Sequence, residues 1–149
     1  MKMFIQGRWT EAANQIQVKN PYDDSVVDTV PRGGASDVDT AISGAVEGAQ
    51  IMREMPAYDR AQILFATAAL MLERTEDLAR TISSEEGKIL AEGRFEASRA
   101  AEIIQLSAEE AKRLTGEVLP RDAAPGGAGR FGFTLRVPCG VVAAISPFN

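Results

Sequence analysis

Short apolar stretches separated by turns make up the beginning of the chain. Ile16 and Val18 lie on one side of a segment whose other positions are polar, which is typical of a half-buried strand. Turn-forming Pro, Gly, Asn and Asp residues separate this segment from its neighbours. The pattern therefore predicts three short strands, at residues 4–9, 15–20 and 26–30.

Helical spacing of apolar residues replaces this pattern from residue 36 onward. We expect Ser36 and Thr75 to cap helix starts, and Gly87 to end a helix in the left-handed conformation. The second helix is apolar on almost every side, which predicts burial on more than one face. Four helices are predicted, at residues 36–52, 56–74, 75–84 and 88–114.

The chain changes character again after Gly116. A short strand, a loop rich in Pro and Gly, and a strand with alternating apolar residues up to Val137 predict a hairpin. Residues 140–145 are continuously apolar, as in a parallel strand covered on both faces. Helices followed by such a strand predict the α/β fold class.

Composition narrows the chemistry that these elements can perform. The chain is 45% hydrophobic and 25% charged, and its formal charge of −5 argues against a nucleic-acid partner. We also expect no membrane span, because no apolar run reaches about 20 residues. The first residues contain no extended apolar region, so we expect no signal peptide either. Zero histidines and one cysteine exclude zinc sites and His-based catalytic sites within these residues, and they fit a cytoplasmic protein.

Three features invite a functional interpretation that their context does not support. Residues 127–132 match G-x-G-x-x-G, but a loop precedes them and a strand pattern follows, so we interpret them as a flexible loop. Cys139 has no histidine or helix start beside it to activate its thiol, so we expect a small buried side chain rather than a nucleophile. Residues 85–88 are interpreted as a helix end and its turn, not as a charged active site.

Asn149 is the strongest candidate for chemistry. It follows the predicted buried strand, at the end of a sheet where α/β proteins bind their ligands. Its side-chain amide is a neutral donor that could polarise a carbonyl group. An Asn after Pro and Phe could equally form a simple turn, and the residues alone leave both interpretations open.

The last residues, 136–149, closely resemble the motif R-x-P-x-G-V-V-x-x-I-x-P-[WF]-N of the NAD(P)-dependent aldehyde dehydrogenase superfamily. Segments in the same order resemble the family along nearly the whole chain: FIQGRW, VKNPYDDSVV, SDVDTAISGA, AYDRAQIL, SSEEGK and TGEVLP. This resemblance implies the N-terminal part of a Rossmann-like cofactor-binding domain over residues 1–119. It implies an oligomerisation hairpin segment at 120–138 and the first inner strand at 139–149.

The resemblance also implies a reaction. A family member oxidises an aldehyde to its carboxylic acid with NAD or NADP, through a cysteine thiohemiacetal. Asn149 would donate to the oxyanion, and four residues would lie along the cofactor: Ile145, Ser146, Pro147 and Phe148. Phe148 stands where Trp is commoner, as in subfamilies acting on small polar aldehydes. A homo-oligomer, dimer or tetramer, would form through the hairpin around residues 119–137.

The family's nucleophilic Cys, general-base Glu and cofactor-binding Lys lie beyond this motif. Cys139 stands where the family usually has an aliphatic residue, so it does not take the nucleophile's place. We therefore expect these 149 residues alone to be inactive. The alternative is a non-catalytic paralogue or subunit that acts as an interaction module, with the hairpin as its docking edge.

Overall fold

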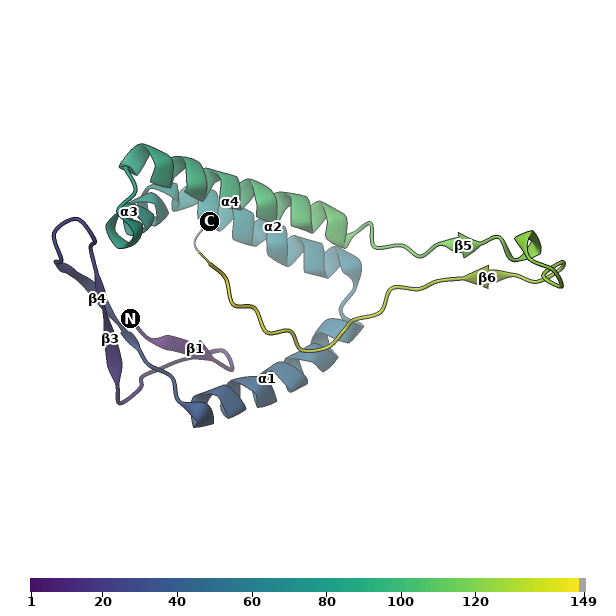
Figure 1. Ribbon diagram of the computed structural model, residues 1–149, viewed down its shortest axis with the longest axis horizontal. Helices are drawn as coiled ribbons and strands as arrows, with labels where there is room; N and C mark the ends of the chain where they lie inside the picture. Colours follow the sequence, from purple (N-terminus) through teal and green to yellow (C-terminus); the bar gives the residue numbers. More distant parts are fainter. Residues whose placement is uncertain (148–149) are drawn as a thin grey trace.

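The computed structural model describes residues 1–147, and its strands form three separate antiparallel pairs (Figure 1). The pairs are β1 (Met3–Ile5) with β2 (Arg8–Thr10), β3 (Gln15–Lys19) with β4 (Val26–Pro31), and β5 (Val118–Leu119) with β6 (Gly132–Phe133). Segment 4–9, predicted as one strand, is instead a tight hairpin in which Phe4 opposes Trp9. Gln6 and Gly7 have φ values of 51° and 75°, the left-handed conformation that two-residue hairpin turns favour.

Four α-helices follow, as the apolar spacing predicted. They are α1 (Ala35–Glu54), α2 (Ala57–Glu73), α3 (Thr75–Glu86) and α4 (Leu90–Ala111). Gly87 ends α3 with a φ of 72°, which confirms its predicted left-handed conformation. Helix α4 ends several residues before its predicted end, and the last predicted turn is not helical.

Both predicted helix caps are wrong. Gly34, not Ser36, precedes α1, and its backbone N–H donates to Asp37 Oδ2 at 2.8 Å. The Thr75 hydroxyl donates backward to the Leu72 carbonyl oxygen at 2.8 Å instead of accepting from α3. An acidic residue three positions after the cap can satisfy the backbone N–H of the cap residue, so Asp37 stabilises the start of α1.

Helices α2, α3 and α4 pack side by side, and small residues form their contact (Figure 1). The buried side chains are all alanines: Ala61, Ala68, Ala79, Ala97, Ala101 and Ala108. Alanines let helix axes approach closely, but each buries little apolar area. The predicted burial of α2 on more than one face is wrong, because Leu70 and Leu72 remain about half exposed.

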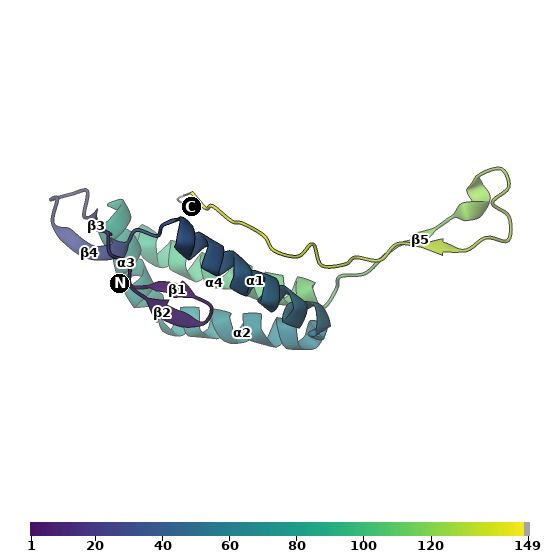
Figure 2. The ribbon, with the colours of Figure 1, turned by 90° about the horizontal axis from the view of Figure 1, so that it is seen from below.

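Beyond α4 the chain projects away from the helices as a long arm, residues 113–136, and returns as an extended tail, residues 137–147 (Figures 1 and 2). In the arm, the Thr134 N–H donates to the Glu117 carbonyl oxygen at 2.8 Å, and the Thr134 hydroxyl accepts the Glu117 N–H at 2.9 Å. The predicted hairpin is therefore present, with β5 and β6 pairing over two residues each.

The tail corrects two expectations. Residues 134–147 form no strand, so the predicted buried strand at 140–145 is absent from the described structure. A parallel strand needs neighbouring strands to accept and donate its backbone hydrogen bonds, and none pairs with this segment within residues 1–147. For the same reason Cys139 is exposed rather than buried. The three-part domain division stays a prediction.

Candidate functional site

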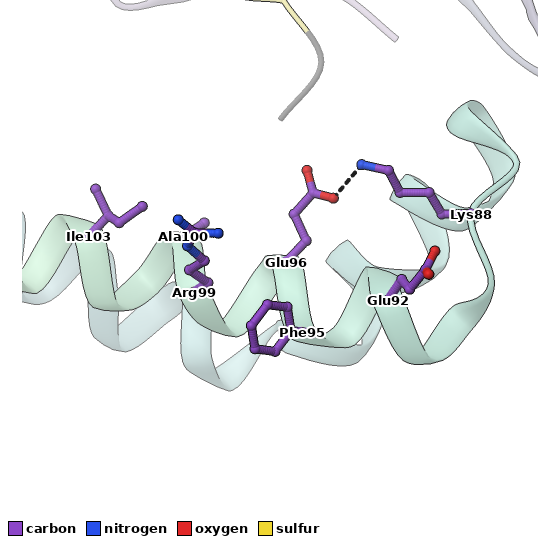
Figure 3. A pocket seen from close by; sticks show the side chains of 7 residues that line it. All are labelled: Lys88, Glu92, Phe95, Glu96, Arg99, Ala100 and Ile103. Carbon is purple, nitrogen blue, oxygen red and sulfur yellow. Dashed lines mark hydrogen bonds and ion pairs between the residues drawn. The ribbon is translucent and has the colours of Figure 1, made fainter.

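A groove of about 610 Å³ lies along α4, and charged and apolar side chains line it together (Figure 3). Its residues are Lys88, Glu92, Phe95, Glu96, Arg99, Ala100 and Ile103. Lys88 comes from the turn between α3 and α4, and the others from the first four turns of α4. A concave surface with a few polar groups among apolar ones is the usual form of a small-molecule site.

Lys88 joins two carboxylates at one end of this groove. Its ammonium lies 2.6 Å from Glu86 Oε2 and 2.6 Å from Glu96 Oε2. The hydrogen bond to Glu86, followed by that to Glu96, raises the pKa of Lys88 above its ordinary value. The Lys88 backbone carbonyl accepts the Ser83 hydroxyl at 2.7 Å, which fixes the turn that presents the lysine. The interpretation of residues 85–88 as a helix end is confirmed.

Arg99 lies farther along the groove, one turn beyond Glu96. Phe95 and Ile103 lie one turn before and one turn after it on α4, so all three share one face. Within residues 1–147 no carboxylate lies within ion-pairing distance of the Arg99 guanidinium. The groove therefore combines one unpaired cation with apolar neighbours.

The residues predicted for the site from the sequence lie on the tail or beyond the described chain. Ile145 is 99% exposed, and Ser146 and Pro147 are exposed as well. Phe148 and Asn149 lie outside the described residues. Farther back on the tail, Pro138, Gly140 and Val141 line a hollow of about 240 Å³ against α1.

The described residues do not form a complete nicotinamide site. Three exposed tail residues cannot enclose a dinucleotide. Residues 127–131 lie in turns and irregular chain near the tip of the arm, and Gly132 begins the short strand β6 rather than a helix. The interpretation of residues 127–132 as a loop is confirmed. Within residues 1–147 no cluster of acidic and cysteine side chains could hold a metal ion. Across the same range, each helix is too short or too polar to cross a membrane.

Sequence reasoning missed the groove on α4. The signal was present in the spacing of Phe95, Arg99 and Ile103, at four-residue intervals on one helix face. Arg99 is exposed and lies between two apolar residues of this stripe, so its guanidinium is accessible to a ligand. The motif at the end of the chain instead placed the predicted site at residues 145–149.

Comparison with known proteins decides the family. The sequence model of the Aldehyde dehydrogenase family matches residues 9–149, nearly the whole chain. The chain belongs to the aldehyde dehydrogenase family. The resemblance seen in residues 136–149 is therefore confirmed, and with it the coarse expectation that the chain's relatives act on aldehydes.

Two curated relatives show what this chain is similar to. It is 38% identical over 147 residues to 3-sulfolactaldehyde dehydrogenase of Priestia megaterium, covering 99% of the chain and 30% of that protein. It is also 38% identical over 147 residues to the NADP-dependent succinate-semialdehyde dehydrogenase of Escherichia coli, covering 97% of the chain and 30% of that protein. The chain thus spans about 30% of the length of these relatives.

Solved structures confirm the fold class of this chain. Aldehyde dehydrogenase 21 of Physcomitrella patens, in complex with the product succinate, matches with a TM-score of 0.83 and 32% identity, covering 89% of the chain and 28% of that protein. An NADP complex of glyceraldehyde-3-phosphate dehydrogenase from Bacillus halodurans matches with a TM-score of 0.81 and 32% identity, covering 85% and 27%. Nicotinamide cofactors are therefore used within the family to which the chain belongs.

Proposed function

We propose that the chain is the N-terminal portion of an enzyme that oxidises a small aldehyde to its carboxylic acid, with NAD or NADP as the electron acceptor. The observation that carries this proposal is the family match over residues 9–149, which ends on the motif with Asn149. The relatives that match at 38% identity are aldehyde dehydrogenases more than three times as long as the chain. The nucleophilic cysteine, which the resemblance implies, would then lie outside these 149 residues.

Within that enzyme we assign roles to the last five residues. Asn149 would donate its side-chain N–H to the oxyanion that forms when the aldehyde carbon is attacked. Residues 145–148 would lie along the cofactor. Two features support this assignment: the motif match itself, and the exposure of Ile145, Ser146 and Pro147, which leaves the described part of this segment open to a ligand.

For the substrate we propose an aldehyde that carries an acidic group at its other end. The names of both curated relatives denote such substrates, 3-sulfolactaldehyde and succinate semialdehyde, and the structure from Physcomitrella patens contains succinate. Substrates of this kind differ from simple aldehydes by one full negative charge. An enzyme can select them strongly only with a cation or hydrogen-bond donors placed to meet that charge.

The test is a substrate panel with the complete protein encoded by the gene that carries this chain. Formation of reduced nicotinamide is followed with succinate semialdehyde, butanal and benzaldehyde, each with NAD and with NADP. Oxidation of at least one aldehyde supports the proposal. Absence of oxidation with every pair contradicts it and favours a non-catalytic interaction module. The 149-residue chain tested alone should form no reduced nicotinamide.

We also propose that the enzyme is cytoplasmic and assembles as a dimer or tetramer through the arm. The arm projects from the helices and pairs only two residues per strand, so its edges are available to another chain (Figure 1). Replacing residues 120–131 by a two-residue Asn-Gly turn should shift the mass measured by light scattering to that of the monomer. An unchanged oligomer mass would contradict assembly through the arm.

A further inference from the structure

We propose that Arg99 is the residue that selects the substrate, by binding the carboxylate or sulfonate at the far end of the aldehyde in the groove on α4. This inference rests on the proposed oxidation of acidic aldehydes. It adds the position and the chemistry of the recognition site, neither of which lies in the motif at residues 136–149. The binding site for the acidic group would then be built from α4, whereas the chemistry would depend on residues at and beyond the tail.

Charge pairing within the groove leaves Arg99 as the cation that can accept an anion. Lys88 already contacts two carboxylates at 2.6 Å, so its charge is compensated by Glu86 and Glu96. Arg99 lies one turn beyond Glu96, and no carboxylate in residues 1–147 pairs with it. The groove also contains the carboxylates of Glu92 and Glu96, and Glu96 is already paired with Lys88. An anion would therefore bind farther along the groove, at the Arg99 guanidinium.

The neighbours of Arg99 suit the remaining part of such a substrate. Phe95 and Ile103 flank it on the same helix face, about 6 Å away by helix geometry. Both side chains are more than half exposed, so they offer an apolar surface to the short carbon chain between the two ends of the substrate. A guanidinium also offers two parallel N–H donors, which match the two oxygens of a carboxylate or sulfonate.

The residues that the proposed function uses lie on the tail, at the described end of the chain and beyond it. The tail returns from the arm over the helices instead of extending away from them (Figures 1 and 2). A close view shows Ile103, Arg99 and Phe95 along α4, with Glu96 between Arg99 and Phe95 and joined to Lys88 (Figure 3). A substrate lying along this face would present its acidic end to α4 while its aldehyde end remained free.

Three variants of the complete protein test the inference. Arg99→Met removes the charge and the N–H donors, and Arg99→Lys keeps the charge without the paired donors. Arg94→Met is the matched control, because it removes the same charge from α4 at a position that contacts Glu76 and does not line the groove. For each variant, kcat/KM is measured with succinate semialdehyde and with butanal, which has the same number of carbons and no charge.

We expect Arg99→Met to lower kcat/KM for succinate semialdehyde by roughly 10- to 150-fold, the effect of losing hydrogen bonds to a charged group. Butanal should change by less than about threefold, because it makes no such contact, and Arg99→Lys should fall between Arg99→Met and the wild type. Arg94→Met should leave the ratio of the two substrates unchanged. Equal losses for both substrates, or no loss for the acidic one, would overturn the assignment of Arg99.

A binding experiment separates this inference from the proposed reaction. Succinate is titrated into the wild type and into Arg99→Met, and the heat of binding is measured. The inference requires binding to the wild type that is weakened at least about tenfold in the variant. If no aldehyde is oxidised but this pattern holds, the reaction is wrong and the acid site stands. If succinate binds neither protein, or binds both equally, the acid site is wrong even when aldehydes are oxidised.

Discussion

Gly93 of α4 lies against the backbone of Ala79 in α3, with no space for a side chain between the two helices. A Cβ atom placed on Gly93 would lie 2.6 Å from the Ala79 carbonyl oxygen, well inside van der Waals contact. Both residues are buried, and the groove begins on the same turns of α4. This contact therefore sets how closely α4 can approach α3, and with it the position of the groove-lining residues.

Gly93→Ala should destabilise the protein. Overpacking costs about 1–3 kcal/mol, while the better helix propensity of alanine returns up to about 1 kcal/mol. The midpoint of urea unfolding should therefore fall. Gly48→Ala in α1 is the control, because a Cβ there meets nothing within 4 Å, and it should raise stability by up to about 1 kcal/mol. Equal effects of the two substitutions would show that α3 and α4 move apart without cost.

Glu76 and Arg94 link α3 to α4 at the surface, and their pairing should depend on pH. Arg94 Nε lies 2.8 Å from Glu76 Oε2, and this hydrogen bond is the main cause that holds the Glu76 pKa below its ordinary value. A lowered carboxyl pKa contributes stability above the ordinary value, and that contribution is lost as the pH falls through the lowered one. Arg94→Met should raise the Glu76 titration midpoint, measured by NMR.

The control for this titration is Arg99→Met, which removes an arginine from the same helix at a position that makes no contact with Glu76. It should leave the Glu76 midpoint where it is. Arg80 also pairs with Glu76, at 2.8 Å, so Arg94→Met should bring the midpoint only part of the way to the ordinary value. An unchanged midpoint in Arg94→Met would mean that the ion pair does not persist in solution.

Removing the Lys88 charge should destabilise the turn between α3 and α4. Lys88→Met would leave Glu86, whose side chain is 16% exposed, beside Glu96 without the ammonium that compensates both. Breaking one partner of a buried pair costs more than replacing both. The melting temperature should therefore fall in Lys88→Met and recover in part in the double variant Lys88→Met with Glu86→Gln. A double variant no more stable than the single one would contradict this account.

Local patterns predicted the elements better than their burial. Helical spacing found all four helices, and Gly87 marked the end of α3 because only glycine adopts a positive φ there at low cost. The caps failed because several neighbouring residues could serve: Asp37 satisfied the N–H of Gly34, and Ser36 was left inside α1. Which residue caps the helix depends on small differences in free energy between adjacent candidates. The pattern of apolar and polar residues gives no information about these differences.

Burial could not be predicted from apolar runs alone, since it depends on what packs against them. Residues 140–145 have the composition of a buried strand, yet within the described chain no neighbouring strand pairs with them, and Cys139 is exposed. The same reason explains why Leu70 and Leu72 on α2 remain about half exposed. The same holds for the candidate site. The motif that ends at Asn149 could be recognised in the sequence, whereas the groove around Arg99 could be recognised only from the structure, which shows that Lys88 is paired with carboxylates.

The two interpretations of Asn149 predict different losses in Asn149→Ala. As an oxyanion donor it stabilises the transition state more than the bound aldehyde, so kcat should fall about 10²- to 10³-fold in the complete protein with little change in KM. As a turn former it would affect the free energy of unfolding and leave the rate near that of the wild type. Asn14→Ala, the same substitution at an exposed position, is the control and should change neither quantity measurably. Rates measured at saturating aldehyde together with urea unfolding of each variant decide between the two, and a wild-type kcat in Asn149→Ala would exclude the oxyanion role.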